Sequence, residues 1–173
     1  MRSYLSGGAF GDAGRTVVIE EGLTGPELSL LAICDGRTAV PLAPAQDYKR
    51  IGDGHAGPNT GGMGCYSPPG WLAESDTDRI RRDVTERVIA QLAAEGRPFR
   101  GALYPGMMMT GDGPRVIEFN ARLGDPEAEV LLPRLRTELL AICEAVTANR
   151  LGDLDVEWDE RATVGVMMAS PGY

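Results

Sequence analysis

The residues best suited to chemistry lie in the segment 116–122, Val-Ile-Glu-Phe-Asn-Ala-Arg. Side chains alternate faces along a strand, so Glu118 and Asn120 are expected on one side, which Arg122 continues if the strand extends that far. A carboxylate and an amide oxygen are hard donors that suit Mg²⁺, and an arginine beside them stabilises charge on a transferring phosphoryl group. Any amphipathic strand shows the same alternation, so this segment alone favours an ordinary half-exposed strand.

Two more carboxylates follow this segment at a sharp turn, where residues 124–127 read Gly-Asp-Pro-Glu. Asp125 and Glu127 stand where a helix begins, and the free backbone N–H groups of a helix start can bind an anion. Acids at a helix start are equally typical of ordinary caps.

A second group of candidates is the segment 46–50, Gln-Asp-Tyr-Lys-Arg, followed by a long glycine-rich loop. Residues 57–64 of that loop, Gly-Pro-Asn-Thr-Gly-Gly-Met-Gly, allow the backbone to approach a ligand and offer N–H groups to phosphate. Lys49 and Arg50 supply positive charge. The alternative is a flexible surface loop, but compact domains seldom carry long loops without a function.

A third glycine-rich segment, residues 7–14, contains neither a Walker A motif nor a GxGxxG fingerprint. A flap that covers phosphates and a frayed terminal loop both fit its spacing.

Composition narrows the class of protein. The 173 residues carry 17 Lys and Arg against 25 Asp and Glu, a net charge of -8, which argues against nucleic-acid binding. No apolar run approaches the roughly 20 residues that span a bilayer, and the first residues lack the basic stretch and apolar core that are typical of a signal peptide. Three scattered cysteines and one histidine argue against a zinc site or a disulfide framework. These features predict a reduced, cytoplasmic protein with no membrane partner.

The candidate residues must be positioned by strands and helices that the hydrophobic pattern predicts. Together these elements indicate a mixed α/β fold with a largely antiparallel sheet packed by helices. Ile117 and Phe119 are expected to face its core. The dipeptide Asp35-Gly36 favours a tight hairpin. The expected strands are 16–20, 27–34, 38–42, 102–110, 115–120 and a buried strand at 162–169. The expected helices are 76–95, with Ser75 or Asp76 as its cap and Gly96 as its end, a short turn at 127–132, and 137–148, which buries Leu139, Leu140, Ile142, Cys143 and Val146.

The segments 46–50, 57–68 and 116–127 together closely resemble the phosphoribosylamine–glycine ligase family, also called glycinamide ribonucleotide synthetases, within the ATP-grasp superfamily. The resemblance covers nearly the whole chain. It implies an ATP-grasp core, classed as α/β (α+β), that is incomplete relative to the family. Residues 1–15 would be a remnant of the ATP-lid subdomain, and residues 16–173 the ATP-grasp catalytic subdomain. The family's N-terminal domain, most of its lid and its C-terminal domain would be absent.

The resemblance also implies roles for individual residues. The nucleotide would bind to the segment 18–23, with ATP and Mg²⁺ or Mn²⁺ as cofactors. The strand 102–110 carries no carboxylate, although many ATP-grasp enzymes place an acidic metal ligand there. The implied metal ligands are Glu118 and Asn120, the ATP-binding residues Glu20, Glu21, Leu23 and Glu27, and the catalytic residues Arg122, Asp125 and Lys49. The implied substrate- and phosphate-binding residues are Asp47, Arg50, Asn59, Thr60, Gly61, Gly62 and Glu127.

The reaction that the resemblance implies is the ATP-dependent joining of glycine to 5-phosphoribosylamine through a glycyl phosphate, in de novo purine synthesis. The partners are therefore small molecules, and the oligomeric state is left open. Because the lid segment that carries a nucleotide-contacting lysine is missing, the chain by itself is expected to be inactive. Two alternatives are a non-catalytic module that binds ATP and Mg²⁺, and another ATP-grasp carboxylate–amine ligase.

Overall fold

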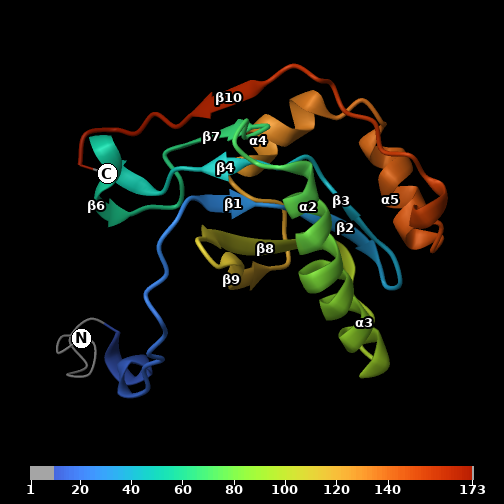
Figure 1. Cartoon of the computed structure of the whole chain (residues 1–173), viewed down its shortest axis with the longest axis horizontal. Coiled ribbons are helices and arrows are strands. Elements are labelled where there is room, and N and C mark those ends of the chain that lie inside the picture. Colours follow the sequence, from blue (N-terminus) through green and yellow to red (C-terminus); the bar gives the residue numbers. More distant parts are fainter. Residues whose placement is uncertain (1–9, 173) are drawn as a thin grey trace.

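The strands of the chain form three antiparallel sheets in a computed structural model that describes residues 10–172 (Figure 1). The largest sheet has the strand order β1-β8-β2-β3, with β9 also paired to β8. The second sheet has the order β10-β7-β4, and β5 pairs with β6 in a two-stranded ribbon. The strands are β1 (Glu27–Ser29), β2 (Ala32–Asp35), β3 (Ala39–Pro41), β4 (Gln46–Asp47), β5 (Arg50–Gly52), β6 (Ala56–Asn59), β7 (Gly64–Ser67), β8 (Arg100–Thr110), β9 (Gly113–Asn120) and β10 (Thr163–Val166).

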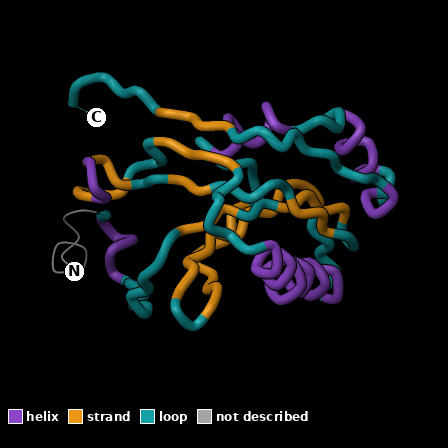
Figure 2. Tube along the Cα trace, turned by 45° about the horizontal axis from the view of Figure 1, so that its top comes forward, coloured by secondary structure: helices purple, strands orange, loops and turns teal. Residues whose placement is uncertain are grey.

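Helices flank the largest sheet, as the trace in Figure 2 also shows. One long helical run consists of α2 (Glu74–Ile80), a π-helical segment (Arg81–Glu86) and α3 (Arg87–Ala94). The other helices are α4 (Glu127–Leu131) and α5 (Leu139–Thr147), with short 3-10 turns at Gly11–Arg15, Asp53–His55, Leu132–Arg134 and Leu151–Asp153. The mixed α/β class and the antiparallel pairing are confirmed.

The expected strand 27–34 is present but interrupted between β1 and β2. Both parts keep one register against β8, with Ser29 opposite Gly106 and Ala32 opposite Leu103. In this register Pro105 lies opposite the interruption, and proline has no N–H group to donate to the ladder. One missing donor therefore divides a single line of pairing into two short strands.

The two faces of the largest sheet pack against different helices, because side chains alternate along β1, β2 and β8. On one face, Met107 and Leu28 bury Ile80 of the helical run. On the other face, Leu31 and Tyr104 pack with residues of α4. Alternate positions of the same strands thus build two separate parts of the core.

The long helix 76–95 is confirmed, but its start differs from the expectation. It begins at Glu74 after Ala73, and neither Ser75 nor Asp76 caps it. Acidic residues in the first turn instead complement the partial positive charge of the helix start. Gly96 ends the helix with φ +74°, a conformation that glycine adopts without strain.

The expected strand 16–20 is wrong. This segment is extended but has no strand partner within residues 10–172, and it lies apart from the sheets between the first 3-10 turn and β1 (Figure 1). Val18 is 83% exposed and Ile19 is 76% exposed. A β-branched sequence favours an extended backbone, but only a neighbouring strand makes that backbone part of a sheet.

The expected buried strand at 162–169 is β10, and its predicted burial is wrong. β10 is an edge strand paired only to β7. Its outward side chains Val164 and Val166 are 74% and 75% exposed. In α5, Ile142 is buried as expected, whereas Leu139, Leu140 and Cys143 are exposed.

Three expectations concern the ends or the surroundings of the chain. The glycine-rich flap 7–14 begins with residues 7–9, which lie outside the described residues. The domain boundary at residue 15 coincides with the end of the first 3-10 turn and stays a prediction. Among residues 10–172, no helix is long and apolar enough to cross a membrane.

Met107 provides a test of the core between β8 and the long helix. It is fully buried against Leu28, Leu30 and Ile80. Met107→Ala is expected to lower the free energy of unfolding by about 2–5 kcal/mol, because the cavity it leaves adds to the lost burial. Met168→Ala is the matched control, since Met168 is 94% exposed. Urea unfolding of both variants gives the comparison, and equal losses would contradict this account of the core.

Candidate functional site

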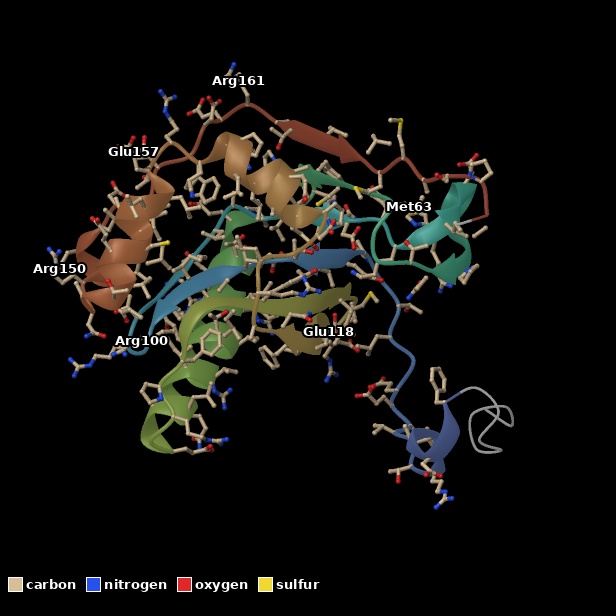
Figure 3. All side chains as sticks on the ribbon, turned by 180° about the vertical axis from the view of Figure 1, so that it is seen from behind. Met63, Arg100, Glu118, Arg150, Glu157 and Arg161 are labelled. Atoms are coloured by element: carbon tan, nitrogen blue, oxygen red, sulfur yellow. The ribbon has the colours of Figure 1, made fainter. Side chains whose placement is uncertain are left out.

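A β-bulge in β9 decides which way Glu118 points. Glu118 lies opposite Gly106 of β8, but the next pair is Val116 opposite Met107, so Ile117 is an extra residue in the ladder. Such a bulge changes the face on which the following side chains lie. Val116 therefore shares the face of Met107, which packs against the long helix, and Glu118 lies on the opposite face (Figure 3).

Two apolar residues of β9 are less buried than expected. Ile117 and Phe119 were expected to face the core, yet they are 44% and 46% exposed. Ile117 is the bulged residue without a partner of its own, and it lines the cavity beside Glu118. Phe119 is regularly paired with Pro105 and faces Val88 and Leu92 of the long helix, but across an open cleft that leaves it half exposed.

The proposed metal ligands share a face, as the sequence indicated. Asn120 donates a hydrogen bond from Nδ2 to Oε1 of Glu118, at 3.1 Å. Arg122 instead donates from Nη1 to the carbonyl of Leu123, at 3.0 Å, and is exposed. One carboxylate and one amide oxygen fit a Mg²⁺-like cation, which keeps several waters and takes further ligands from phosphates. Within residues 10–172 there is no group of three or more His, Cys, Asp or Glu that could hold a metal ion.

Glu118 opens onto a cavity of about 210 Å³ on this face of the sheet. The cavity brings together four residues that the sequence singled out from distant segments. They are Glu27, Lys49, Asn59 and Glu118, and the remaining lining residues are Leu28, Ser29, Tyr104, Gly106, Met107 and Ile117. The wall of this cavity therefore contains two carboxylates, one side-chain amide and the single ammonium group of Lys49.

A second cavity, of about 530 Å³, shares Glu27, Asn59 and Ile117 with the first one. It collects the residues to which the family resemblance gave a nucleotide-binding role. Its other lining residues are Glu20, Glu21, Leu23, Arg50, Met108, Arg115 and Val116. The two cavities thus adjoin along Glu27, Asn59 and Ile117, whereas the implied ligands Asn120, Arg122 and Asp125 line neither of them.

Lys49, the single lysine of the chain, connects two acids at this site. Its Nζ lies 3.0 Å from Oε2 of Glu27 and 3.1 Å from Oδ2 of Asp47. Burial works against the ammonium charge, but the hydrogen bond to Glu27 and the charge of Asp47 outweigh it and raise the pKa of Lys49. Lys49 is therefore a stable cation in the wall of the smaller cavity.

Asp47 is almost completely buried behind Lys49, with its side chain 3% exposed. Burial raises the pKa of Asp47 to about 6, Lys49 opposes this effect, and the negative charges of Glu127 and Glu27 add to it. Its Oδ1 atom is buried without a hydrogen-bond partner among residues 10–172. The carboxylate is thus held with only one of its two oxygens satisfied.

Glu127 is buried at the start of α4 and does not line the smaller cavity. Its Oε1 accepts hydrogen bonds from Ser29 Oγ at 2.7 Å and from the Tyr104 hydroxyl at 2.6 Å. Burial raises the pKa of Tyr104, and the charge of Glu127 adds to this, so the phenol keeps its proton and donates it. Sequence reasoning missed Ser29 and Tyr104, since neither lies in a recognisable motif.

Several backbone N–H groups of the glycine-rich loop are already hydrogen-bonded within the protein, so they are not free to bind phosphate. The N–H of Thr60 bonds to the carbonyl of Lys49 at 2.7 Å, and that of Met63 bonds to the carbonyl of Tyr48 at 2.8 Å. The N–H of Gly62 bonds to the hydroxyl of Thr60 at 3.1 Å. The expectation of free backbone donors is therefore wrong for these three residues, whose N–H groups instead fix the loop beside Lys49.

Gly62 and Gly61 offer a matched pair of tests for this loop. A Cβ on Gly62 would lie 2.4 Å from Cδ of Pro126, and Gly62 has φ +137°, whereas a Cβ on Gly61 meets nothing within 4 Å. Gly62→Ala is expected to lower the free energy of unfolding by roughly 1–3 kcal/mol through overpacking. Gly61→Ala should change it much less. Thermal and urea unfolding of both variants measure the difference, and similar stabilities would refute the close packing of Gly62 on Pro126.

The raised pKa of Asp47 predicts a defined pH dependence of stability. The folded state keeps a proton that the unfolded state releases between the ordinary value of 3.8 and about 6. Asp47 therefore contributes stability at low pH that is lost as the pH rises through about 6. Relative to Asp47→Asn, the wild-type chain should lose stability from pH 4 to pH 6 and then level off. Urea unfolding at a series of pH values checks this, and a constant difference between the two proteins would disprove it.

Comparisons with known proteins agree with this geometry. The sequence model of the family described as "Phosphoribosylglycinamide synthetase, ATP-grasp (A) domain" matches residues 1–128. The phosphoribosylamine–glycine ligase of Allochromatium vinosum is 52% identical over 174 residues, covering 100% of this chain and 41% of that protein. The enzyme of the same name from Brucella melitensis is 48% identical over 166 residues, covering 96% of this chain and 39% of that protein.

A solved structure shows the same arrangement. The crystal structure of phosphoribosylamine–glycine ligase from Thermotoga maritima superposes with a TM-score of 0.80 and 36% identity, covering 99% of this chain and 43% of that one. This chain thus spans about two-fifths of the length of these relatives. The expected ATP-grasp fold, incomplete relative to the family, is confirmed, and the chain belongs to the phosphoribosylglycinamide synthetase family.

Proposed function

We propose that this chain provides the nucleotide- and metal-binding part of a phosphoribosylamine–glycine ligase. The reaction joins glycine to 5-phosphoribosylamine with ATP and gives glycinamide ribonucleotide, in purine synthesis in the cytoplasm. The observation that carries the proposal is the meeting of Glu27, Lys49 and Glu118 in one cavity that continues into the cavity of Glu20, Glu21 and Leu23. Family membership supports the same conclusion.

The larger cavity fits the nucleoside part of ATP. Glu20, Glu21 and Leu23 belong to an extended segment, where backbone groups outside a sheet are available to bind a purine edge. Glu27 borders both cavities, so its carboxylate is placed to accept hydrogen bonds from ribose hydroxyls between the base and the phosphates. Residues 1–15 would then belong to the lid over this nucleotide.

The smaller cavity fits the triphosphate end. Glu118 and Asn120 would hold Mg²⁺ or Mn²⁺, which when bound neutralises charge on the phosphates. Lys49 carries its positive charge in the same wall, and Arg50 lines the adjoining cavity. Arg122 and Asp125 follow on the exposed turn after β9, where they would meet the carboxylate substrate at the edge of the cavity.

The glycine-rich loop would serve the substrates and exclude water. Asn59 lines both cavities, and Thr60 fixes the loop to the backbone of Lys49. Gly62 brings the loop's backbone close to Asp47 and Pro126, and Gly61 precedes it with open space around it. Glu127 does not line the smaller cavity. It would act indirectly, by orienting Tyr104 and Ser29, which do line that cavity, through hydrogen bonds.

A second candidate is a module that binds ATP with a divalent cation and does not catalyse ligation. The observation that favours it is that two of the implied catalytic residues, Arg122 and Asp125, line neither of the two cavities. Glycine-dependent release of ADP by this chain would support the ligase, whereas nucleotide binding without such release would support the module.

Glu118→Gln tests the metal and nucleotide site with little change of shape. Its affinity for ATP in the presence of Mg²⁺ is expected to fall roughly tenfold, about 1.4 kcal/mol, because the charged ligand is lost. Isothermal titration calorimetry measures this affinity. Glu144→Gln is the control, since Glu144 is an exposed acid on α5 that lines neither cavity. Equal affinities of Glu118→Gln and the wild-type chain would overturn the assigned site.

A further inference from the structure

The buried carboxylate of Asp47 has one oxygen atom without a hydrogen-bond partner among residues 10–172. Oδ2 of Asp47 pairs with Lys49 at 3.1 Å, but Oδ1 has no hydrogen-bond partner among residues 10–172. Leaving a buried acceptor unsatisfied costs about 1–3 kcal/mol, and more for a charged group. Asp47 is therefore a strong acceptor that lacks one donor.

The charges around Asp47 show which kind of donor is missing. Glu27 from β1, Glu127 from α4 and Lys49, two residues after Asp47, are the charged groups that act on it. Three carboxylates thus share one ammonium group. The local charge is negative, so the arrangement attracts a cation and repels a phosphate or a carboxylate.

The cover over Oδ1 is a glycine backbone. A Cβ on Gly62 would come within 2.9 Å of Oδ1, so no other residue fits there without displacement. Gly61, the preceding residue, has open space around it. Asn59 of the same loop and Lys49, the ion-pair partner of Asp47, both line the smaller cavity, so Asp47 lies directly behind the wall of that cavity.

We propose that Oδ1 of Asp47 accepts the primary amino group of a substrate, with Gly62 as the cover that this group displaces. The inference rests on the proposed ligase function and adds an atom and a ligand group to it. An ammonium group is compact, carries three donors and brings the positive charge that the cluster lacks. A hydroxyl donor would bring no charge. A divalent cation would need more oxygen ligands than Asp47 can supply, and none of the acids within residues 10–172 are grouped in that way.

Two substrates of the proposed reaction contain this group, namely glycine and 5-phosphoribosylamine. The test is a carboxyl ¹³C NMR titration of Asp47 in the whole chain, with each ligand in a separate arm. One arm uses glycine, with acetate as the control that lacks the amine. The other uses ribose 5-phosphate with ammonia, which condense to the amine, with ribose 5-phosphate alone and ammonium chloride alone as controls.

The expected result is a fall in the pKa of Asp47 from about 6 with the amine and not with its amine-free control. A shift of about one pH unit corresponds to a tenfold preference of the amine for ionised Asp47. A shift in the glycine arm alone assigns the atom to glycine, and a shift in the other arm alone assigns it to the ribosylamine. No shift in either arm, or an equal shift with the controls, overturns the inference.

Variants separate binding at Oδ1 from a purely structural role of Asp47. Asp47→Asn should abolish the response of the Gly62 amide resonance to the amine, whereas Glu144→Gln, a change of an exposed acid that lines neither cavity, should keep it. A persisting response in Asp47→Asn would place the amine elsewhere. If Asp47→Asn fails to fold, the titration of the wild-type chain still decides the question.

The two proposals fail in distinguishable ways. Nucleotide binding that depends on Glu118, together with no effect of amines on Asp47, would overturn only this inference. Nucleotide binding that is indifferent to Glu118 would overturn the proposed function, whatever the amines do.

Discussion

The site depends on the single lysine of the chain, which pairs with two acids from different sheets. Lys49 pairs with Glu27 from β1 and with Asp47 from β4, so one ammonium group links the large sheet with the smaller one. Partnered charges of this kind are costly to break, because removing one member leaves an uncompensated buried charge. The wall of the cavity is therefore held by the same interaction that gives it its charge.

The strand β8 sets the geometry around this pairing. Its odd-numbered residues Leu103 and Met107 pack toward the long helix, and Tyr104 faces the side of α4 and Glu127. The apolar face anchors the sheet, so the polar face can carry Glu27, Ser29 and Glu118 without weakening that anchor. Stability and chemistry are thus divided between the two faces of one strand.

Most of the fold could be predicted from the sequence where a local pattern decides the structure. The apolar stripe of the long helix and the glycine at its end gave the right helix. Residues 16–20 gave the wrong strand, since strand pairing depends on a partner far away in the sequence. The buried strand expected at 162–169 failed for a related reason, because β10 has a neighbour on one edge only.

The site shows the same division between local and distant causes. Glu118 and Asn120 could be placed on one face from their spacing, and the motifs of the family indicated Glu27, Lys49 and Asn59. The pairing of Lys49 with both acids, and the hydrogen bonds from Ser29 and Tyr104 to Glu127, join residues 2 to 98 positions apart. Apart from the Asp47–Lys49 pair, these contacts join residues 22 to 98 positions apart, and no spacing rule along the sequence indicates them.

The bulge at Ile117 allows two residues that would share a face in a regular strand to lie on opposite faces of β9. Val116 pairs with Met107 and Glu118 pairs with Gly106, although they are two positions apart in the sequence. Deleting Ile117 would make the ladder with β8 regular and leave both side chains on their present faces, because neighbouring residues of a regular strand alternate. Only the Ile117 side chain, which lines both cavities, would be lost. Such a deletion would therefore spare the fold and the placement of the carboxylate, and would change the wall that the two cavities share.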